Sequence, residues 1–232
     1  MTDIHTHILH AIDDGADSIE VSKSMLQIMS KAGVDRVVCT PHFDFTNVSP
    51  EDFLQLRDTR MSELSSYARE SNIELVRGCE LRLTSRILNL DSIGGFCIGD
   101  TRNVLIEMPF SKDWTDSCFD LLTNFIDYFN VRPVIAHVER YNPVIKNIKT
   151  AEKLIELGAV LQLDASSLFE KQYSKTAKKL LKYEMISVVA SDCHNTESRS
   201  PEVLSRAFNE IDRICKNGAR NYLNNFANSL CK

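Results

Sequence analysis

The chain has 232 residues, of which 43% are hydrophobic and 25% charged, and its formal net charge is −5. This is an ordinary globular composition, which excludes a disordered or collagen-like chain, and the acidic balance argues against a protein that binds nucleic acid by neutralising phosphates. No apolar run approaches the roughly 18 residues of a membrane-spanning helix, and the first residues lack the regions of a signal peptide. We therefore expect neither a membrane span nor a leader.

The seven cysteines are scattered and form no C-x-x-C pair. An odd, dispersed set is typical of free thiols in a reducing cytoplasm rather than of disulfides or a thiolate zinc site. Cys193 and Arg199 do fit the C-x5-R spacing of phosphatases with a cysteine nucleophile. Those enzymes wrap the phosphate in a glycine-rich loop, and residues 193–199 contain no glycine. We interpret the spacing as accidental.

Apolar runs typical of strands alternate with segments typical of helices. Several runs are continuously apolar, as in parallel strands covered on both faces. We expect strands at residues 3–8, 34–39, 73–79, 104–108, 131–136, 159–163 and 186–190. We expect helices at residues 18–32, 50–71, 116–129, 151–157, 174–183 and 201–216.

This alternation predicts a single domain over residues 1–232 with an α/β fold, a compact TIM-like (β/α)7 barrel of seven strands. An open, doubly wound parallel sheet is the alternative, because periodicity does not separate the two. Residues 89–103 contain three glycines and are expected to form the one long irregular connection.

The histidines follow the expected strands. All six lie at or just beyond a strand end, at His5, His7, His10, His42, His137 and His194. Carboxylates take matching places at Glu80, Glu107 and Asp192. A lone histidine is more often packed in a core or exposed than bound to a metal. In a parallel barrel, however, the carboxyl ends of all strands meet on one face, so the joint pattern predicts a metal site.

The number of candidate ligands predicts more than one ion. The nine candidates are His5, His7, Asp14, His42, Glu80, Glu107, His137, Asp192 and His194. One ion with an open catalytic position cannot use so many, whereas two or three ions sharing a carboxylate can. Such clusters stabilise the attacking and leaving oxygens in phosphoryl transfer. Nitrogen and oxygen ligands without thiolate suit manganese, iron or zinc.

Several short segments resemble the PHP (polymerase and histidinol phosphatase) superfamily and, within it, the CpsB/YwqE-type bacterial tyrosine-protein phosphatases. These segments are DIHTHI at 3–8, DDG at 13–15, TPH at 40–42, GCE at 78–80, IAHVERY at 135–141 and ASDCHN at 190–195. The resemblance runs from residue 3 to about residue 230.

The resemblance implies a distorted seven-stranded barrel with a trinuclear centre of divalent ions, manganese first, with iron, zinc or magnesium as the other candidates. The first ion would be bound by His5, His7, Glu80 and Asp192. The second would be bound by Glu80, Glu107 and His137, and the third by Asp14, His42 and His194. Arg140 and Arg199 would hold the phosphate while a metal-activated hydroxide attacks phosphorus.

The implied function is hydrolysis of phosphotyrosine on the tail of a bacterial tyrosine kinase, in the cytoplasm, during capsular or exopolysaccharide synthesis. Two alternatives stay open: a small-molecule phosphatase such as a histidinol phosphatase, and a non-enzymatic, metal-stabilised binding module. The sequence leaves the oligomeric state undetermined.

The sequence departs from the family pattern in three places. Phe43 and Asp44 follow His42 where relatives often have basic or histidine residues. Asp164 stands where relatives have asparagine, and is either an outer carboxylate of the site or a structural residue at a strand end. His10 matches no ligand position, and we expect an incidental loop histidine.

Overall fold

The computed structural model describes residues 1–46, 48–215 and 218–232. Every strand pairing in this part of the chain is parallel. The strands are β1 (Thr2–Thr6), β2 (Arg36–Cys39), β3 (His42–Phe43), β4 (Glu74–Arg77), β5 (Glu80–Arg82), β6 (Asn103–Glu107), β7 (Arg132–Ile135), β8 (Val160–Asp164) and β9 (Val188–Ala190). Each expected apolar run overlaps one of these strands, so the parallel α/β class is confirmed.

The predicted seven-stranded barrel is confirmed only in part. The strands form two sheets, one ordered β1-β2-β4 and the other β3-β5-β6-β7-β8-β9, rather than one seven-stranded ladder. The ladder breaks at Pro41, between β2 and β3, and at Gly78, between β4 and β5. Proline has no backbone N–H to donate to a ladder, and a Cβ at Gly78 would lie 2.7 Å from the Val38 side chain. β3 and β5 were not expected from the sequence.

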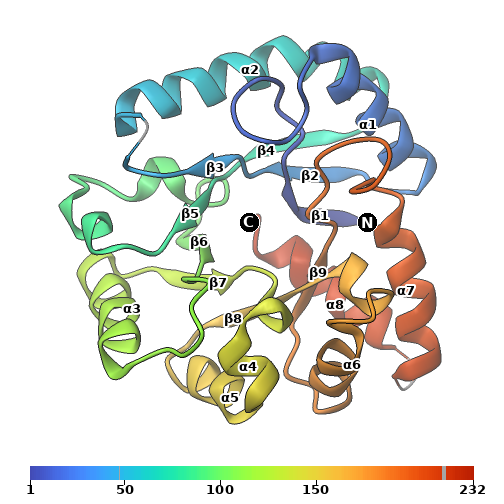
Figure 1. Cartoon of the computed structure of the whole chain (residues 1–232). Coiled ribbons are helices and arrows are strands. Elements are labelled where there is room, and N and C mark those ends of the chain that lie inside the picture. The colour runs from blue at the N-terminus through green and yellow to red at the C-terminus, as the bar shows by residue number, and fades with distance from the viewer. Residues whose placement is uncertain (47, 216–217) are drawn as a thin grey trace.

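The two sheets curl around a common centre (Figure 1). This curl brings β9 back beside β1, where the Asp192 N–H donates to the His5 carbonyl at 3.0 Å and the His7 N–H donates to the Cys193 carbonyl at 2.9 Å. An open doubly wound sheet would leave these two strands apart, so that alternative does not describe the fold.

Most helices lie outside the strands, whereas the C-terminal helix runs behind β9 toward the centre of the curl (Figure 1). The helices are α1 (Ile19–Lys31), α2 (Pro50–Glu70), α3 (Asp116–Phe129), α4 (Asn142–Lys146), α5 (Lys149–Glu156), α6 (Ser174–Lys182), α7 (Val203–Ile214) and α8 (Ala219–Ser229). Six of them begin and end within two residues of the expected helices. The last of the six, expected at 201–216, spans Val203–Ile214, and residue 216 lies outside the described residues. α4 and α8 were not expected. Among the described residues, no helix is long and apolar enough to cross a membrane.

The buried apolar side chains form two clusters. The larger one packs the helices against the strands. The smaller one fills the interior of the curl with residues from the strands, together with Ala227 of α8 and Leu230 just after it. α8 also contacts both β1 and β9.

Irregular segments join several strands to helices. The expected irregular connection at 89–103 contains the short 3-10 turn η2 (Gly94–Phe96) and follows another, η1 (Ser85–Asn89). Two further turns come directly after strand ends, η3 (Val138–Arg140) after β7 and η4 (Ala165–Leu168) after β8.

Candidate metal centre

The ends of the strands deliver the predicted ligands. His5 lies on β1, His42 on β3, Glu80 on β5 and Glu107 at the end of β6. His137 follows β7, and both Asp192 and His194 follow β9. Six of the nine predicted ligands are buried, and Asp14, His42 and Glu107 are the more exposed ones.

Two of these residues have an unusual backbone. His137 has φ +34° and Asp192 has φ +49°, in the left-handed region that non-glycine residues rarely occupy. Such conformations cost about 1–3 kcal/mol each and gather at functional sites. Both residues come two positions after the end of a strand, so the strain lies where the chain turns a ligand side chain toward the centre.

Glu80 is the hub of the cluster. Its Oε2 lies 2.9 Å from His42 Nδ1, 3.2 Å from His5 Nε2 and 3.3 Å from His7 Nε2. Its Oε1 lies 3.0 Å from His137 Nε2. A buried carboxylate whose two oxygens face four imidazoles can bridge two ions, as the ligand count requires.

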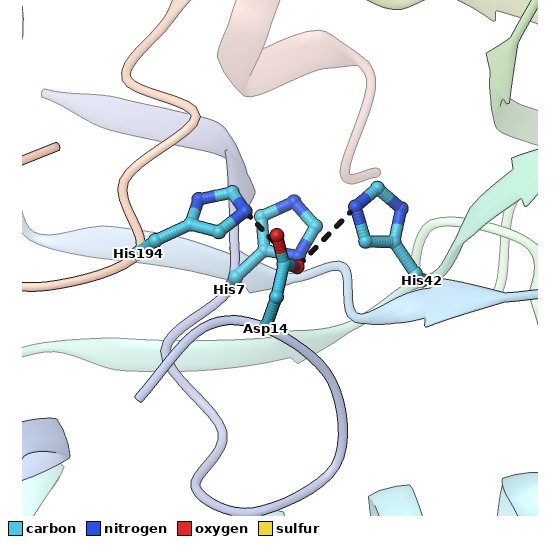
Figure 2. Close-up of side chains that lie close together, drawn as sticks. All are labelled: His7, Asp14, His42 and His194. Atoms are coloured by element: carbon cyan, nitrogen blue, oxygen red, sulfur yellow. Dashed lines mark ion pairs between the residues drawn. The ribbon is translucent and has the colours of Figure 1, made fainter. Parts of the chain in front are cut away.

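Asp14 forms a second meeting point at the mouth of the site. Its Oδ1 lies 3.5 Å from His42 Nε2 and 3.4 Å from His194 Nε2. Figure 2 shows Asp14 with His42 and His194 on either side and His7 close behind. The rings of His7 and His194 have their centroids 3.9 Å apart.

The candidate ligands fall into three overlapping groups whose ligand atoms lie within 4.8 Å of one another: His7, Asp14, His42 and His194; His5, His7 and Glu80; and His42, Glu80 and Glu107. Asp192 adjoins the second group, since its Oδ1 lies 3.3 Å from His5 Nε2 and 3.4 Å from His7 Nε2. His137 adjoins the others through Glu80. The nine side chains therefore come together, although His7 and His42 each belong to two groups and the division among individual ions stays a prediction.

The outer faces of the imidazoles are held by residues that the sequence did not single out. Asp13 Oδ2 accepts from His7 Nδ1 at 2.6 Å and from the His42 N–H at 2.9 Å. Gln162 Oε1 lies 3.1 Å from His5 Nδ1 and accepts from the His137 N–H at 2.9 Å. Partners of this kind fix the tautomer, so that Nε2 of His5 and His7 faces the centre as a free acceptor.

Each of these partners had a signal in the sequence. Asp13 directly precedes the predicted ligand Asp14, and Gln162 is a polar residue inside an apolar strand, which needs a hydrogen-bonding partner. The glycine that completes the DDG segment is required by the fold, because a Cβ at Gly15 would lie 2.1 Å from the His7 carbonyl oxygen.

The charges of the cluster suit divalent cations. Burial alone would raise the pKa values of Glu80 and Asp192, but the surrounding imidazoles hold both pKa values well below the usual range. Burial, and then the charge of Glu80, raises the pKa of Glu107 to about 7. Burial and the charge of His7 lower the pKa of His194 to about 3. Burial alone would lower the pKa values of His5 and His7, but the neighbouring carboxylates raise both, so these imidazoles hold protons that a divalent cation would displace.

Two further observations support this fit. His194 Nε2 is buried and makes no hydrogen bond. The Nε2 atoms of His5 and His7 lie 3.1 Å apart, between the carboxylates of Glu80 and Asp192. A cation satisfies such converging acceptors, and the set lacks thiolate, so the residues present fit hard or borderline divalent ions.

Both predicted phosphate-binding arginines lie against the cluster. Arg140 Nη1 donates to Asp192 Oδ2 at 2.9 Å, and Arg199 Nη2 donates to the same oxygen at 2.7 Å. Arg140 also pairs with Asp164, whose Oδ1 accepts from the Ser166 N–H at 2.8 Å. Asp164 therefore both pairs with Arg140 and caps the η4 turn.

Two further residues considered from the sequence belong to none of the three ligand groups. His10 Nε2 lies 3.1 Å from Glu63 Oε2 of α2, and His10 belongs to none of the three groups. Cys193 is fully buried, and burial raises the pKa of its thiol well above the usual value. A buried, protonated thiol is no nucleophile, which agrees with the interpretation of its spacing to Arg199 as accidental.

Comparison with known proteins assigns the family. Residues 1–228 match the family model described as capsular polysaccharide synthesis, CpsB/CapC. The chain belongs to the CpsB/CapC family.

Similar members include the tyrosine-protein phosphatase CpsB of Streptococcus pneumoniae, 32% identical over 87% of this chain and 86% of the relative. The tyrosine-protein phosphatase YwqE of Bacillus subtilis is 31% identical over 86% of this chain and 80% of the relative. A solved structure, from a study of YwqE from B. subtilis and CpsB from S. pneumoniae as metal-dependent tyrosine phosphatases, superposes with a TM-score of 0.85 at 27% identity, covering 100% of this chain and 94% of that one.

Proposed function

We propose that this CpsB/CapC protein is a metal-dependent protein-tyrosine phosphatase that acts on a tyrosine-phosphorylated kinase of capsular or exopolysaccharide synthesis in the cytoplasm. One observation carries the proposal. Asp192 turns one oxygen toward the imidazoles of His5 and His7 and the other toward Arg140 and Arg199. The proposed metal ligands and phosphate-binding groups thus meet at a single carboxylate, which supports a site where ions and arginines act on the same phosphate.

The nine predicted ligands would hold two or three ions, with manganese as the proposed metal. When bound, divalent ions supply Lewis acidity and lower the pKa of water, which yields a nucleophile at neutral pH. We propose Glu80 as the bridging ligand, because both of its oxygens face imidazoles.

The protein's own residues bind and orient the ester. Arg140 and Arg199 present planar guanidinium groups that match pairs of phosphate oxygens. Asp164 holds Arg140 in place, while Asp13 and Gln162 hold the imidazole rings. Residues 1–232 would act as one unit. The two sheets would serve together as a barrel of seven strands, with β2 and β3 counted as one interrupted strand and β4 and β5 as another.

The test compares substrates on metal-free and metal-loaded protein. Chelation should abolish turnover of a phosphotyrosyl peptide from a kinase tail, and added Mn²⁺ should restore it. Preference for histidinol phosphate over the peptide would instead favour a small-molecule phosphatase. Tight metal binding without turnover of either compound or of p-nitrophenyl phosphate would favour a binding module.

A further inference from the structure

A cavity of about 270 Å³ opens beside the metal centre. Its wall includes Asp192 and both arginines, Arg140 and Arg199. This volume lies just below the roughly 300–1,000 Å³ of pockets for drug-sized ligands, so the cavity suits a compact chemical group.

The cavity adjoins the position proposed for the phosphate. Asp192 Oδ1 faces His5 and His7 at 3.3 and 3.4 Å, whereas Oδ2 accepts from Arg140 and Arg199 at 2.9 and 2.7 Å. A phosphate that binds both guanidinium groups next to Asp192 would therefore lie at the edge of the cavity. The group esterified to that phosphate can extend into it.

One wall of the cavity is aromatic. Among the described residues that line it, Phe169 is the one aromatic side chain, and it is 43% exposed in surroundings that are mostly charged or hydroxylic. The Arg206 guanidinium carbon lies 4.8 Å from the centre of the Phe169 ring, which steadies the ring by a cation–π contact.

The position of Phe169 is tied to that of the phosphate-binding arginine. Phe169 follows the η4 turn, and its N–H donates to the Ser166 carbonyl at 2.9 Å. Asp164 caps this turn through the Ser166 N–H at 2.8 Å and pairs with Arg140. One carboxylate therefore fixes both the arginine and the turn that carries the ring.

We propose that Phe169 forms the wall against which the aromatic ring of an aryl phosphate ester packs, so that the cavity favours aryl over alkyl phosphates. This proposal rests on the proposed function and names the side chain that would recognise a tyrosine ring. The competing ring is Phe110, which is 54% exposed and stacks on His137 with ring centroids 5.6 Å apart. Phe110 does not line the cavity that holds Arg140 and Arg199.

The experiment measures the dissociation constants of phenylphosphonate and methylphosphonate on manganese-loaded protein by calorimetry. We expect the unmodified protein to bind phenylphosphonate more tightly. Phe169→Ala should weaken phenylphosphonate binding by roughly 2- to 10-fold, the range of aromatic pair contacts, and leave methylphosphonate binding unchanged. The dissociation constant of phenylphosphonate for Phe169→Leu should lie between those of the unmodified protein and Phe169→Ala. The kcat/KM for p-nitrophenyl phosphate should fall in parallel.

Matched variants separate this proposal from others. Tyr128→Ala removes a ring of α3 that is 68% exposed and lies outside the cavity, and it should change neither constant. The proposal would be overturned if Phe169→Ala left the ratio of the two dissociation constants unchanged. It would also be overturned if Phe110→Ala selectively weakened phenylphosphonate binding. Failure to hydrolyse the phosphotyrosyl peptide overturns the proposed function instead, because the phosphonate ratio needs no turnover.

Discussion

Glu80 is the residue on which the metal centre most depends. It is fully buried, and its two oxygens face four imidazoles from β1, β3 and the end of β7. The ligand types could be predicted from the sequence because histidines and carboxylates follow strand ends, and parallel strands bring those ends together. The sequence could not predict that His7 and His42 each belong to two groups of ligands, because this depends on how the side chains are rotated.

The bridging role of Glu80 predicts a difference in metal content. Glu80→Ala should lose about one ion more than His137→Ala, because Glu80 is assigned to two ions and His137 to one. Elemental analysis of the purified variants measures the stoichiometry. His10→Ala is the control. It should keep its full metal content, because His10 pairs with Glu63 away from the centre. Equal losses from Glu80→Ala and His137→Ala would remove the case for a bridge.

The arginines predict a loss of rate without a loss of metal. A charged hydrogen bond to phosphate contributes about 1.5–3 kcal/mol, which corresponds to roughly 10- to 100-fold in rate if it is realised mainly in the transition state. Arg140→Ala should therefore lower kcat/KM for a phosphotyrosyl peptide by that factor, and Arg140→Lys should recover only part of it because lysine offers no planar fork.

Steady-state kinetics and elemental analysis together check this expectation. Arg86→Ala, which changes an exposed arginine of η1, is the control and should leave both quantities unchanged. If Arg140→Ala and Arg199→Ala both hydrolyse the peptide at the unmodified rate, the phosphate is held elsewhere.

At the scale of elements, the strand breaks shape the site. The sequence predicted apolar runs at 34–39 and 73–79, but not the short strands β3 and β5 that follow them and carry His42 and Glu80. Besides Pro41 and Gly78 themselves, a contact from another element lies at one of the two breaks. Arg57 of α2 is buried and donates from Nη1 to the Gly78 carbonyl at 3.1 Å and to the Gly95 carbonyl at 2.6 Å. Local periodicity contains no information about such a contact.

The two hydrogen bonds that Arg57 donates to the Gly78 and Gly95 carbonyls predict a large loss of stability when Arg57 is replaced. Arg57→Met keeps the aliphatic stem but leaves two carbonyls without their charged donor, which should lower the free energy of unfolding by about 2–4 kcal/mol. Chemical denaturation measures it. Arg60→Met is the matched control on the same helix, where the arginine pairs at 3.0 Å with the partly exposed Glu63, and it should cost less than about 1 kcal/mol. Similar losses in the two variants would contradict a stabilising role of the hydrogen bonds from Arg57.

At the scale of the whole molecule, α8 is a helix that the sequence did not predict. No helix was expected in this segment, which is rich in asparagine, a residue of weak helix propensity. Packing of Leu223 and Ala227 buries one face of α8, and the Asn224 and Asn228 side chains accept hydrogen bonds from Thr2 at 3.0 and 2.9 Å. Tertiary contacts therefore override the local preference.

Metal binding should stabilise the whole fold, because the ligands come from strand ends spread between His5 and His194 and converge only in the folded chain. A ligand that binds only the folded state adds about 2.7 kcal/mol at a hundred times its dissociation constant. For a chain of this length that corresponds to a rise in Tm of about 5–10 °C. Thermal unfolding of chelated protein across a Mn²⁺ series measures it, and Tm should increase with the logarithm of the free metal concentration. Glu80→Ala should flatten this dependence while His10→Ala leaves it intact. A Tm that does not respond to Mn²⁺ in the unmodified protein would show that the converging side chains bind no structural metal.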